Sequence, residues 1–160
     1  MTILKKNIKF LITLFVLVGL SLYSNFAFSA GGFGGQDEVS LYKSGKKLVL
    51  RAKKLEEKDK VEKAKKLYLK AYDKFEKAYN KDKKNADILN YLGYTLRKTG
   101  NLEQAETYYL KGLELDSKHL GINEYLGELY VQTNRIELAK KRLEVLSGCN
   151  CEEYEELKEL

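Results

Sequence analysis

The residues that could take part in chemistry are few, and two cysteines near the C-terminus are the most conspicuous. Cys149 and Cys151 are separated by one asparagine in a chain of 160 residues that has a single histidine, His119. In an oxidising compartment this pair could form a disulfide, although so short a loop gains little entropic stabilisation. Thiol exchange is a second hypothesis, because an exposed, strained disulfide is easily reduced. A metal site with His119 would lack third and fourth ligands at a recognisable spacing.

Catalytic arrangements are equally scarce. A hydrolytic triad would need His119, which lies between two predicted helices, where a capping or linking role is the ordinary explanation. The paired acids Glu152-Glu153 and Glu155-Glu156 lie on a predicted exposed helix, where no burial would raise a carboxyl pKa. The sequence also lacks a nucleophile elbow and a phosphate-binding glycine loop. We therefore expect no catalytic residue, no cofactor and no metal site, and predict that the chain is not an enzyme.

The first thirty residues have the layout of a secretory signal peptide. Three lysines precede an uncharged run over 10–22, which at about 13 residues is shorter than the ~20 that a membrane-spanning helix needs. Ala27 and Ser29 supply small residues three before and one before a cleavage after Ser29. We therefore predict a signal peptide over 1–29 and an exported bacterial protein, periplasmic or secreted, with no membrane span after cleavage. The alternative is a structural envelope protein tethered by an uncleaved Phe10–Leu22 segment.

The segment 30–36 follows the predicted cleavage site and contains four glycines between positions 31 and 35. Glycine has a high backbone entropy that disfavours regular structure. We therefore predict a flexible tether at 30–36.

Charge divides the remaining chain into a basic part and an acidic part. Residues 43–84 hold 17 Lys+Arg against 7 Asp+Glu, whereas residues 85–160 hold 9 against 14. Lysines and acids alternate at helical spacing in the basic part, as in Glu62–Lys66 and Asp73–Lys77, which is typical of a solvated, ion-paired face. Nucleic acid is not expected as a partner, since arginine is scarce and export would separate the two. An acidic partner or envelope phosphate groups are alternatives, and such attraction would weaken at high salt.

A repeat of 34 residues organises the second half of the chain. Tyr91-Leu92-Gly93 recurs as Tyr125-Leu126-Gly127, and four more identities fall at the same offset. They are Ile88 and Ile122, Thr99 and Thr133, Glu103 and Glu137, and Ala105 and Ala139. Seven identities in one register indicate a repeated structural unit.

Apolar residues at spacings of three and four predict two helices in each unit. These helices cover 86–99, 102–115, 120–132 and 136 to about 147. Capping boxes are expected at 59–62, 101–104, 134–137 and 150–153. Small residues at 93, 105, 127 and 139 would let paired helices approach closely. One pair cannot bury its apolar face alone, so the pairs are expected to stack.

This pattern resembles the tetratricopeptide repeat family. The matching positions are Leu89, Leu92-Gly93, Leu96, Ala105 and Tyr109 in one unit, and Leu126-Gly127, Tyr130 and Ala139 in the next. The resemblance implies an all-α fold: an antiparallel helix-hairpin array that coils into a right-handed superhelix and ends in a C-terminal capping helix. We predict this domain over 37–160, with a degenerate repeat at 37–84, repeats at 85–118 and 119–148, and the capping helix at 151–160.

The degenerate repeat departs from the family pattern because Lys58-Asp59 stand where Leu-Gly is expected. An apolar stripe still runs through the segment from Val39 to Leu55 at helical spacing. We favour a turn at 57–59 over the alternative of a single helix from about 39 to 80.

In this family the first helix of each repeat lines a concave groove, and the resemblance assigns groove positions to eight residues. They are Asp87, Asn90, Tyr94, Arg97, Lys98, Glu124, Glu128 and Val131. Polar side chains on a rigid inner face suit an extended peptide. The basic set with which family members clamp a peptide carboxylate is absent, and Glu124 and Glu128 would repel such a terminus, so a neutral or basic segment is expected.

The resemblance therefore implies a non-enzymatic adaptor that binds a peptide segment or a partner helix of another protein. Self-association through an open end of the repeat stack is an additional expectation. The alternative is a thiol-active or structural envelope accessory protein that uses Cys149 and Cys151.

Overall fold

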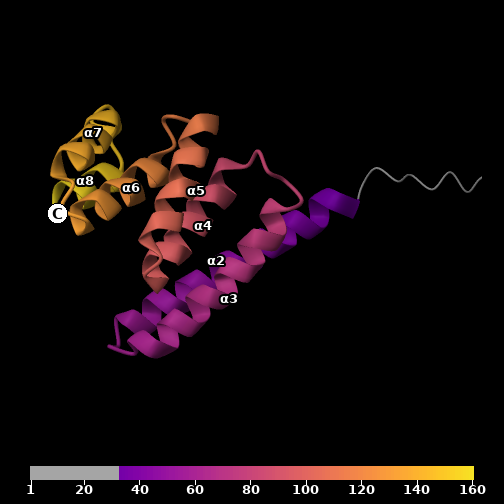
Figure 1. Ribbon diagram of the computed structural model, residues 1–160. Coiled ribbons are helices and arrows are strands. Elements are labelled where there is room, and N and C mark those ends of the chain that lie inside the picture. The colour runs from indigo at the N-terminus through magenta and orange to yellow at the C-terminus, as the bar shows by residue number, and fades with distance from the viewer. Residues whose placement is uncertain (1–32) are drawn as a thin grey trace, which may run out of the picture. The chain divides into compact units, whose positions relative to one another are not determined.

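The computed structural model describes residues 33–160, with side chains from Asp37 onward. This part of the chain forms seven α-helices and no strand (Figure 1). The helices are α2 (Phe33–Glu56), α3 (Val61–Tyr79), α4 (Ala86–Thr99), α5 (Leu102–Leu115), α6 (Leu120–Gln132), α7 (Ile136–Leu146) and α8 (Glu152–Lys158). The all-α prediction is confirmed, and residues 34–160 form one unit. The predicted signal peptide lies outside the described residues.

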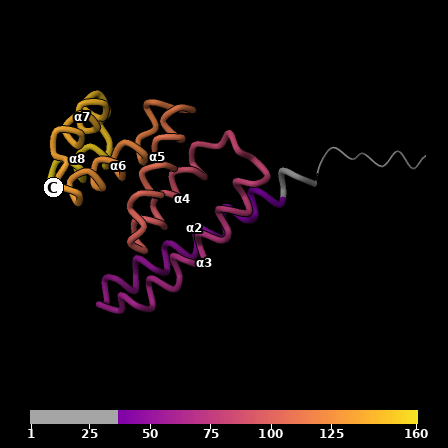
Figure 2. Tube along the Cα trace, viewed as in Figure 1, coloured from indigo at the N-terminus to yellow at the C-terminus, as the bar shows by residue number. Residues whose placement is uncertain are grey.

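Six of the helices form three antiparallel hairpins, α2–α3, α4–α5 and α6–α7 (Figures 1 and 2). Each hairpin packs against the next, through α3 on α4 and through α5 and α4 on α6. The short helix α8 packs against both α6 and α7. None of the described helices is both long and apolar enough to cross a membrane.

The three hairpins turn in the same way. Each first helix is followed by a residue in the left-handed backbone region: Asp59 (φ 53°), Gly100 (φ 95°) and Asn134 (φ 57°). The next amide then donates to the carbonyl five residues earlier, at 2.8 Å from Lys60 to Leu55, 2.9 Å from Asn101 to Leu96, and 2.7 Å from Arg135 to Tyr130. This is the Schellman ending of a helix. The predicted turn at 57–59 is therefore present, and α2 and α3 are two helices.

Three of the four expected capping boxes are wrong. Asp59 and Asn134 end the preceding helix in the left-handed conformation, so their side chains do not cap the following one. The N-cap of α8 is Cys151 rather than Asn150, and it makes no side-chain hydrogen bond to the helix. Of the four candidates only Asn101 acts as an N-cap, accepting the Gln104 amide at 3.3 Å. Asp and Asn suit both roles, because a short polar side chain tolerates the left-handed region and also caps helices.

The first hairpin is a regular unit once it is aligned on its turn. Asp59 then corresponds to Gly100, so that Ala52 takes the place of Gly93 and Tyr68 that of Tyr109. The expectation that Lys58-Asp59 replace Leu-Gly was out of register. Both helices of this hairpin are also longer, with 24 and 19 residues against 14 each in α4 and α5.

The prediction of a flexible tether at 30–36 is corrected for its second half, because α2 begins at Phe33. Glycine in a helix costs only about 1 kcal/mol per residue relative to alanine. A helix already nucleated by a packed segment can therefore extend through several glycines. Residues 30–32 lie outside the described part of the chain.

A small residue facing an aromatic ring brings the helices of a hairpin together. A Cβ atom at Gly93 would lie 2.5 Å from Cε1 of Tyr109, and one at Gly45 would lie 2.6 Å from Cε1 of Phe75. Both rings are fully buried. At Gly127 the nearest side chain is that of Leu157 in α8. The capping helix therefore packs against the small residue of the last hairpin. The small residues thus set the separation of the packed helices.

We predict that Gly93→Ala destabilises the protein, since displacing the buried Tyr109 ring costs up to about 3 kcal/mol. Alanine gains roughly 1 kcal/mol over glycine in a helix, which leaves a net loss of up to about 2 kcal/mol. Urea denaturation measures the change. The matched variant Gly148→Ala has no atom near the new methyl group, so its free energy of unfolding should stay within about 0.5 kcal/mol. Equal stability of the two variants would contradict the close contact.

Candidate functional site

A cavity of about 310 Å³ opens where the first helices of the hairpins meet α8. Its lining residues are Lys53, Glu56 and Glu57 at the end of α2, Tyr94, Arg97 and Lys98 of α4, Tyr125 and Glu128 of α6, and Glu156 of α8. We call these nine residues the groove. Positions 94, 97 and 98 share one face of α4 because helical neighbours are three and four residues apart. Stacking of the hairpins brings this face next to α2 and α6.

Two tyrosines and a guanidinium group form the floor of the groove. The rings of Tyr94 and Tyr125 lie 4.8 Å apart, and the Arg97 guanidinium carbon lies 5.6 Å and 5.7 Å from their centroids. The Lys53 ammonium lies 5.4 Å from the Tyr94 centroid. A cation over an aromatic face is attracted by its negative quadrupole. Burial raises the pKa of both tyrosines, which remain neutral donors and acceptors.

Ion pairs tie the walls of the groove together. Arg97 pairs with Glu128 across α4 and α6, and Lys98 pairs with Glu56 at 2.9 Å across α4 and α2. Glu56 also accepts a hydrogen bond from the Tyr68 hydroxyl at 2.8 Å. These contacts join three successive first helices, so that the groove is a rigid wall rather than a loose surface.

The structure brings four of the eight predicted groove residues together: Tyr94, Arg97, Lys98 and Glu128. The other four do not line the cavity. Asp87 is exposed beside His119, Asn90 and Glu124 are buried, and Val131 packs against the core around Leu96 and Tyr109. Tyr94 itself is only 4% exposed.

Five groove residues were not predicted. Lys53, Glu56 and Glu57 belong to the hairpin whose register was misplaced, and Glu156 belongs to the capping helix. Tyr125 has the same position in its repeat as Tyr91 in the preceding repeat. That identity was the one feature of the sequence that could have indicated Tyr125 as a groove residue.

His119 has the capping and linking role that the sequence indicated. Its Nδ1 accepts the Ile122 amide at 3.2 Å as the N-cap of α6. Its Nε2 lies 3.3 Å from Oδ1 of Asp87, which connects the second and third hairpins. Both ring nitrogens are thus occupied by structural contacts.

Glu124 is the most perturbed acidic group in the described residues. It is 2% exposed, and burial raises the pKa of its carboxyl group to about 9, with further contributions from a hydrogen bond to Glu156 and from the charges of Glu128, Glu156 and Glu153. Burial disfavours the charged form of a carboxyl group, and neighbouring carboxylates act in the same direction. Its Oε1 atom has no hydrogen-bond partner.

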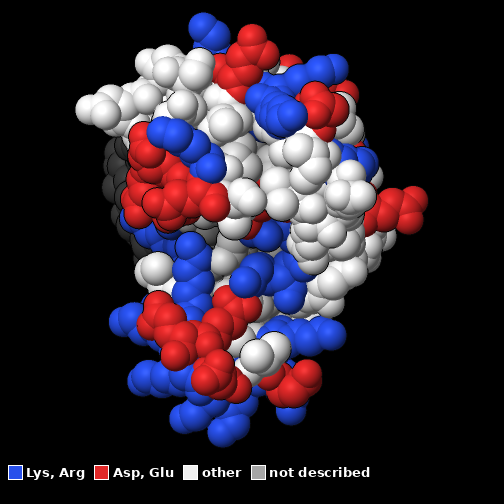
Figure 3. All heavy atoms as spheres, turned by 90° about the vertical axis from the view of Figure 1, so that its left-hand side faces the viewer, with Lys and Arg blue, Asp and Glu red and all other residues white. Residues whose placement is uncertain are grey.

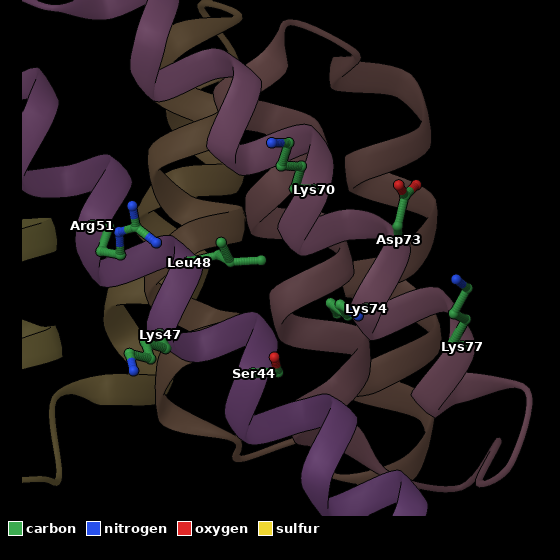
Figure 4. A pocket seen from close by; sticks show the side chains of 8 residues that line it. All are labelled: Ser44, Lys47, Leu48, Arg51, Lys70, Asp73, Lys74 and Lys77. Atoms are coloured by element: carbon green, nitrogen blue, oxygen red, sulfur yellow. The ribbon is translucent and has the colours of Figure 1, made fainter.

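A second cavity, of about 440 Å³, lies between α2 and α3 (Figure 4). Five of its lining residues are basic, namely Lys47, Arg51, Lys70, Lys74 and Lys77, and the others are Ser44, Leu48 and Asp73. We call this the basic cleft. In Figure 4 Leu48 and Lys74 point toward one another between the two helices, and Lys47 and Arg51 lie on the far side of α2.

The basic part of the chain is less ion-paired than the sequence indicated. Neither Glu62–Lys66 nor Asp73–Lys77 is among the ion pairs of the described residues, and none of those pairs involves a cation of the basic cleft. Long side chains on an exposed helix gain little from pairing. The positive charge of α2 and α3 is therefore available to a partner.

Cys149 and Cys151 are joined in a disulfide with their Cα atoms 5.2 Å apart. The bridge lies in the turn between α7 and α8. It is remote in sequence from every residue of the groove except Glu156.

Comparison with known proteins gives one family. Residues 48–118 match the family model described as Tetratricopeptide repeat, which confirms the resemblance seen in the sequence. The chain matches none of the curated protein sequences.

Solved structures with the same kind of fold include the type III secretion translocator chaperone SycD of Yersinia enterocolitica. It aligns with a TM-score of 0.51 at 18% identity, over 73% of this chain and 87% of SycD. SycD in complex with a peptide of the translocator YopD gives 0.48 at 20% identity, over 73% and 86% of the chains. The second TPR of Spaghetti (RPAP3) bound to an HSP90 peptide gives 0.43 at 17% identity, over 66% and 91%. The likeness to the first of these structures, at 18% identity, shows the fold alone.

We predict that the stability of the protein depends on pH through Glu124. Its folded-state pKa of about 9 lies above the ordinary 4.5, so the folded state holds this proton more tightly than the unfolded state. The resulting stabilisation is complete below pH 4.5 and is lost as the pH rises toward 9, by at most about 1.4 kcal/mol per pH unit. Glu124→Gln cannot lose a proton there, so its stability relative to wild type should increase from pH 5 to pH 9.

Urea denaturation of both proteins in metal-free buffer at pH 5, 7 and 9 measures this difference. Glu159→Gln, at an exposed position just after α8, is the control and should show a difference that does not change with pH. A constant difference for Glu124→Gln as well would show that this carboxyl group is not protonated in the folded state.

Proposed function

Because the chain carries tetratricopeptide repeats, we propose that it is a non-enzymatic adaptor that binds an extended segment of a partner protein in the groove. The observation that carries this proposal is the meeting of four helices around one cavity whose walls are held by interhelical ion pairs. A rigid surface loses little conformational entropy when it binds, so that more of the contact energy appears as affinity. Exposed edges of Tyr125 and neighbouring polar side chains offer both contact area and hydrogen bonds.

The charges left over in the groove favour a neutral or basic segment. Arg97 and Lys98 are neutralised by Glu128 and Glu56. Glu57 and Glu156, both exposed, take part in none of the ion pairs of the described residues, and Lys53 lies over Tyr94. Two uncompensated carboxylates against one lysine give the groove a negative balance, which suits a lysine or arginine of the bound segment.

The basic cleft supplies a second, longer-range attraction. Its five cations lie on the first hairpin and do not line the groove. Such a charged surface increases the rate at which an oppositely charged protein is captured. We therefore assign the cleft to steering of an acidic region of the partner, and the groove to holding its extended segment.

We also propose that the protein acts outside the cytoplasm of a bacterium, in the periplasm or after secretion. The support is the layout of residues 1–29, with three lysines before a short apolar run and small residues before the cleavage site. A disulfide between Cys149 and Cys151 is compatible with an oxidising compartment.

Charge reversal in the groove should weaken the binding of a basic segment. Peptides are first selected from a random display library on the mature chain. We expect Glu57→Lys/Glu156→Lys to bind the selected peptides at least about tenfold more weakly, a loss of about 1.4 kcal/mol, because the new ammonium groups repel the ligand's cation. Fluorescence anisotropy of labelled peptides measures the affinity.

The matched control is Glu114→Lys/Glu144→Lys, which makes the same charge change at exposed positions of α5 and α7. It should leave the affinity unchanged within about twofold. Equal weakening by both double variants would mean that net charge alone governs binding, and the groove assignment would then fail.

Export predicts the N-terminus of the mature protein. We expect mass spectrometry of the protein recovered from a bacterial host to give a chain that begins at Ala30, because Ala27 and Ser29 satisfy the requirement for small residues before the cut. Ala27→Leu places a large side chain at that position and should leave the precursor uncut. Recovery of wild-type chains that retain residues 10–22 would support the envelope-tethered alternative instead.

A further inference from the structure

Three carboxylates from two helices meet at one end of the groove. Glu124 and Glu128 lie one turn apart on α6, and Glu156 approaches them from α8. One oxygen from each lies within 4.8 Å of the others. Figure 3, which shows the molecule from the side of α7 and α8, has one group of acidic side chains in its upper half and another lower down, where most of the basic side chains also lie.

The second observation is a buried acceptor without a partner. The side chain of Glu124 is 98% buried, since its exposed fraction is 2%, and its Oε1 atom accepts no hydrogen bond. Buried polar atoms are almost always satisfied, and an unsatisfied carboxylate oxygen is especially costly. This atom belongs to the carboxyl group that supplies one of the three clustered oxygens, so a cation held by the cluster would be a partner for that group.

The cations nearest to the cluster are engaged elsewhere. Arg97 pairs with Glu128, Lys98 pairs with Glu56 at 2.9 Å, and Lys53 lies over the Tyr94 ring. None of them bonds to Glu124 or Glu156 among the described residues. Carboxyl ligands must be deprotonated to hold a metal ion, so the bound state has three carboxylates beside one guanidinium group and two uncompensated negative charges.

We propose that Glu124, Glu128 and Glu156 bind one calcium ion, which fastens α8 to α6. Hard divalent cations prefer carboxylate oxygens, and calcium takes them at about 2.3–2.6 Å. Ligands on opposite sides of such an ion are about twice that distance apart, which matches oxygens separated by up to 4.8 Å. Magnesium demands near-ideal octahedral geometry at about 2.0–2.1 Å, whereas calcium accepts the irregular set of ligands that three side chains from two helices provide. The double charge of the ion balances the two uncompensated carboxylates.

The predicted affinity is modest. Three protein carboxylates leave the remaining coordination positions to water, and sites with few charged ligands bind calcium with dissociation constants on the order of 10⁻⁴–10⁻³ M. The ion would act as a structural clamp, because one of its ligands comes from the seven-residue helix α8 and two come from α6. This inference does not depend on peptide binding in the groove.

Terbium luminescence tests the site, because Tb³⁺ replaces Ca²⁺ and is excited by energy transfer from a nearby tyrosine. Tyr125 is next to Glu124 in the chain and lines the same groove. We expect saturable luminescence from the wild-type protein that excess Ca²⁺ removes. Glu156→Gln and Glu124→Gln should each weaken binding about tenfold or more, because each removes one of three charged ligands.

The matched control is Glu159→Gln, which removes an exposed carboxylate just after α8 and should bind like wild type. Ca²⁺ should also raise the melting temperature of wild type and Glu159→Gln but not that of Glu156→Gln. Tyr125→Phe should weaken the luminescence, with Tyr94 as the remaining donor at 4.8 Å between the two rings, and should keep the calcium-dependent shift in melting temperature.

Three results would overturn the proposal. They are the absence of saturable binding to wild type, equal binding by Glu156→Gln and Glu159→Gln, and a calcium-dependent rise in melting temperature that survives Glu156→Gln. Glu156 is exposed, so its variant remains informative if Glu124→Gln fails to fold. Failure of this test would leave the peptide-binding proposal intact, because the two experiments use different ligands.

Discussion

The close approach of two helices at a small residue opposite a buried ring is the constraint on which the rest of the structure depends. Gly45 faces Phe75 and Gly93 faces Tyr109. Since neither ring has room to move, the distance between the two helices of each hairpin is fixed, and so is the rotation of each helix about its own axis. The same side of every first helix therefore faces the same way, and stacking the hairpins unites those sides into the groove. A substitution that spread one hairpin would displace the groove residues of α4 without touching any of them.

The second half of the chain was predictable because local and global signals agree there. Helices over 86–99 and 102–115 follow from apolar spacing and from the glycine between them, and the structure has the same bounds. The first hairpin was placed out of register, because the 34-residue offset aligns Phe75 with Tyr109 whereas the turns align Tyr68 with Tyr109. The long first hairpin contains both buried rings, Phe75 and Tyr68. Only the position of its turn shows that Tyr68 is the one equivalent to Tyr109.

The candidate site was half predictable for a related reason. Periodicity identifies the face of α4 that carries Tyr94, Arg97 and Lys98, and three of the cavity's lining residues follow from it. Periodicity does not show which residues cover the equivalent face of α6. Glu124 was expected to point into an open groove, but α8 packs over it through Glu156 and Leu157. That contact joins a repeat to a terminal helix outside the repeat, so no internal regularity of the sequence reports it.

The capping helix consequently has two functions that cannot be independent. Glu156 lines the groove and also belongs to the carboxylate cluster, while Leu157 fills the space at Gly127. A cation that holds α8 in place would fix one wall of the groove, and a segment bound against that wall would in turn favour the cation. By thermodynamic linkage the two effects are equal in size. The sign depends on charge: a basic residue placed at Glu156 competes with the ion, whereas a neutral segment contacting only Tyr125 and Lys53 cooperates with it. The acidic end of the groove thus makes the choice of partner sensitive to the ion, through the single side chain that the two sites share.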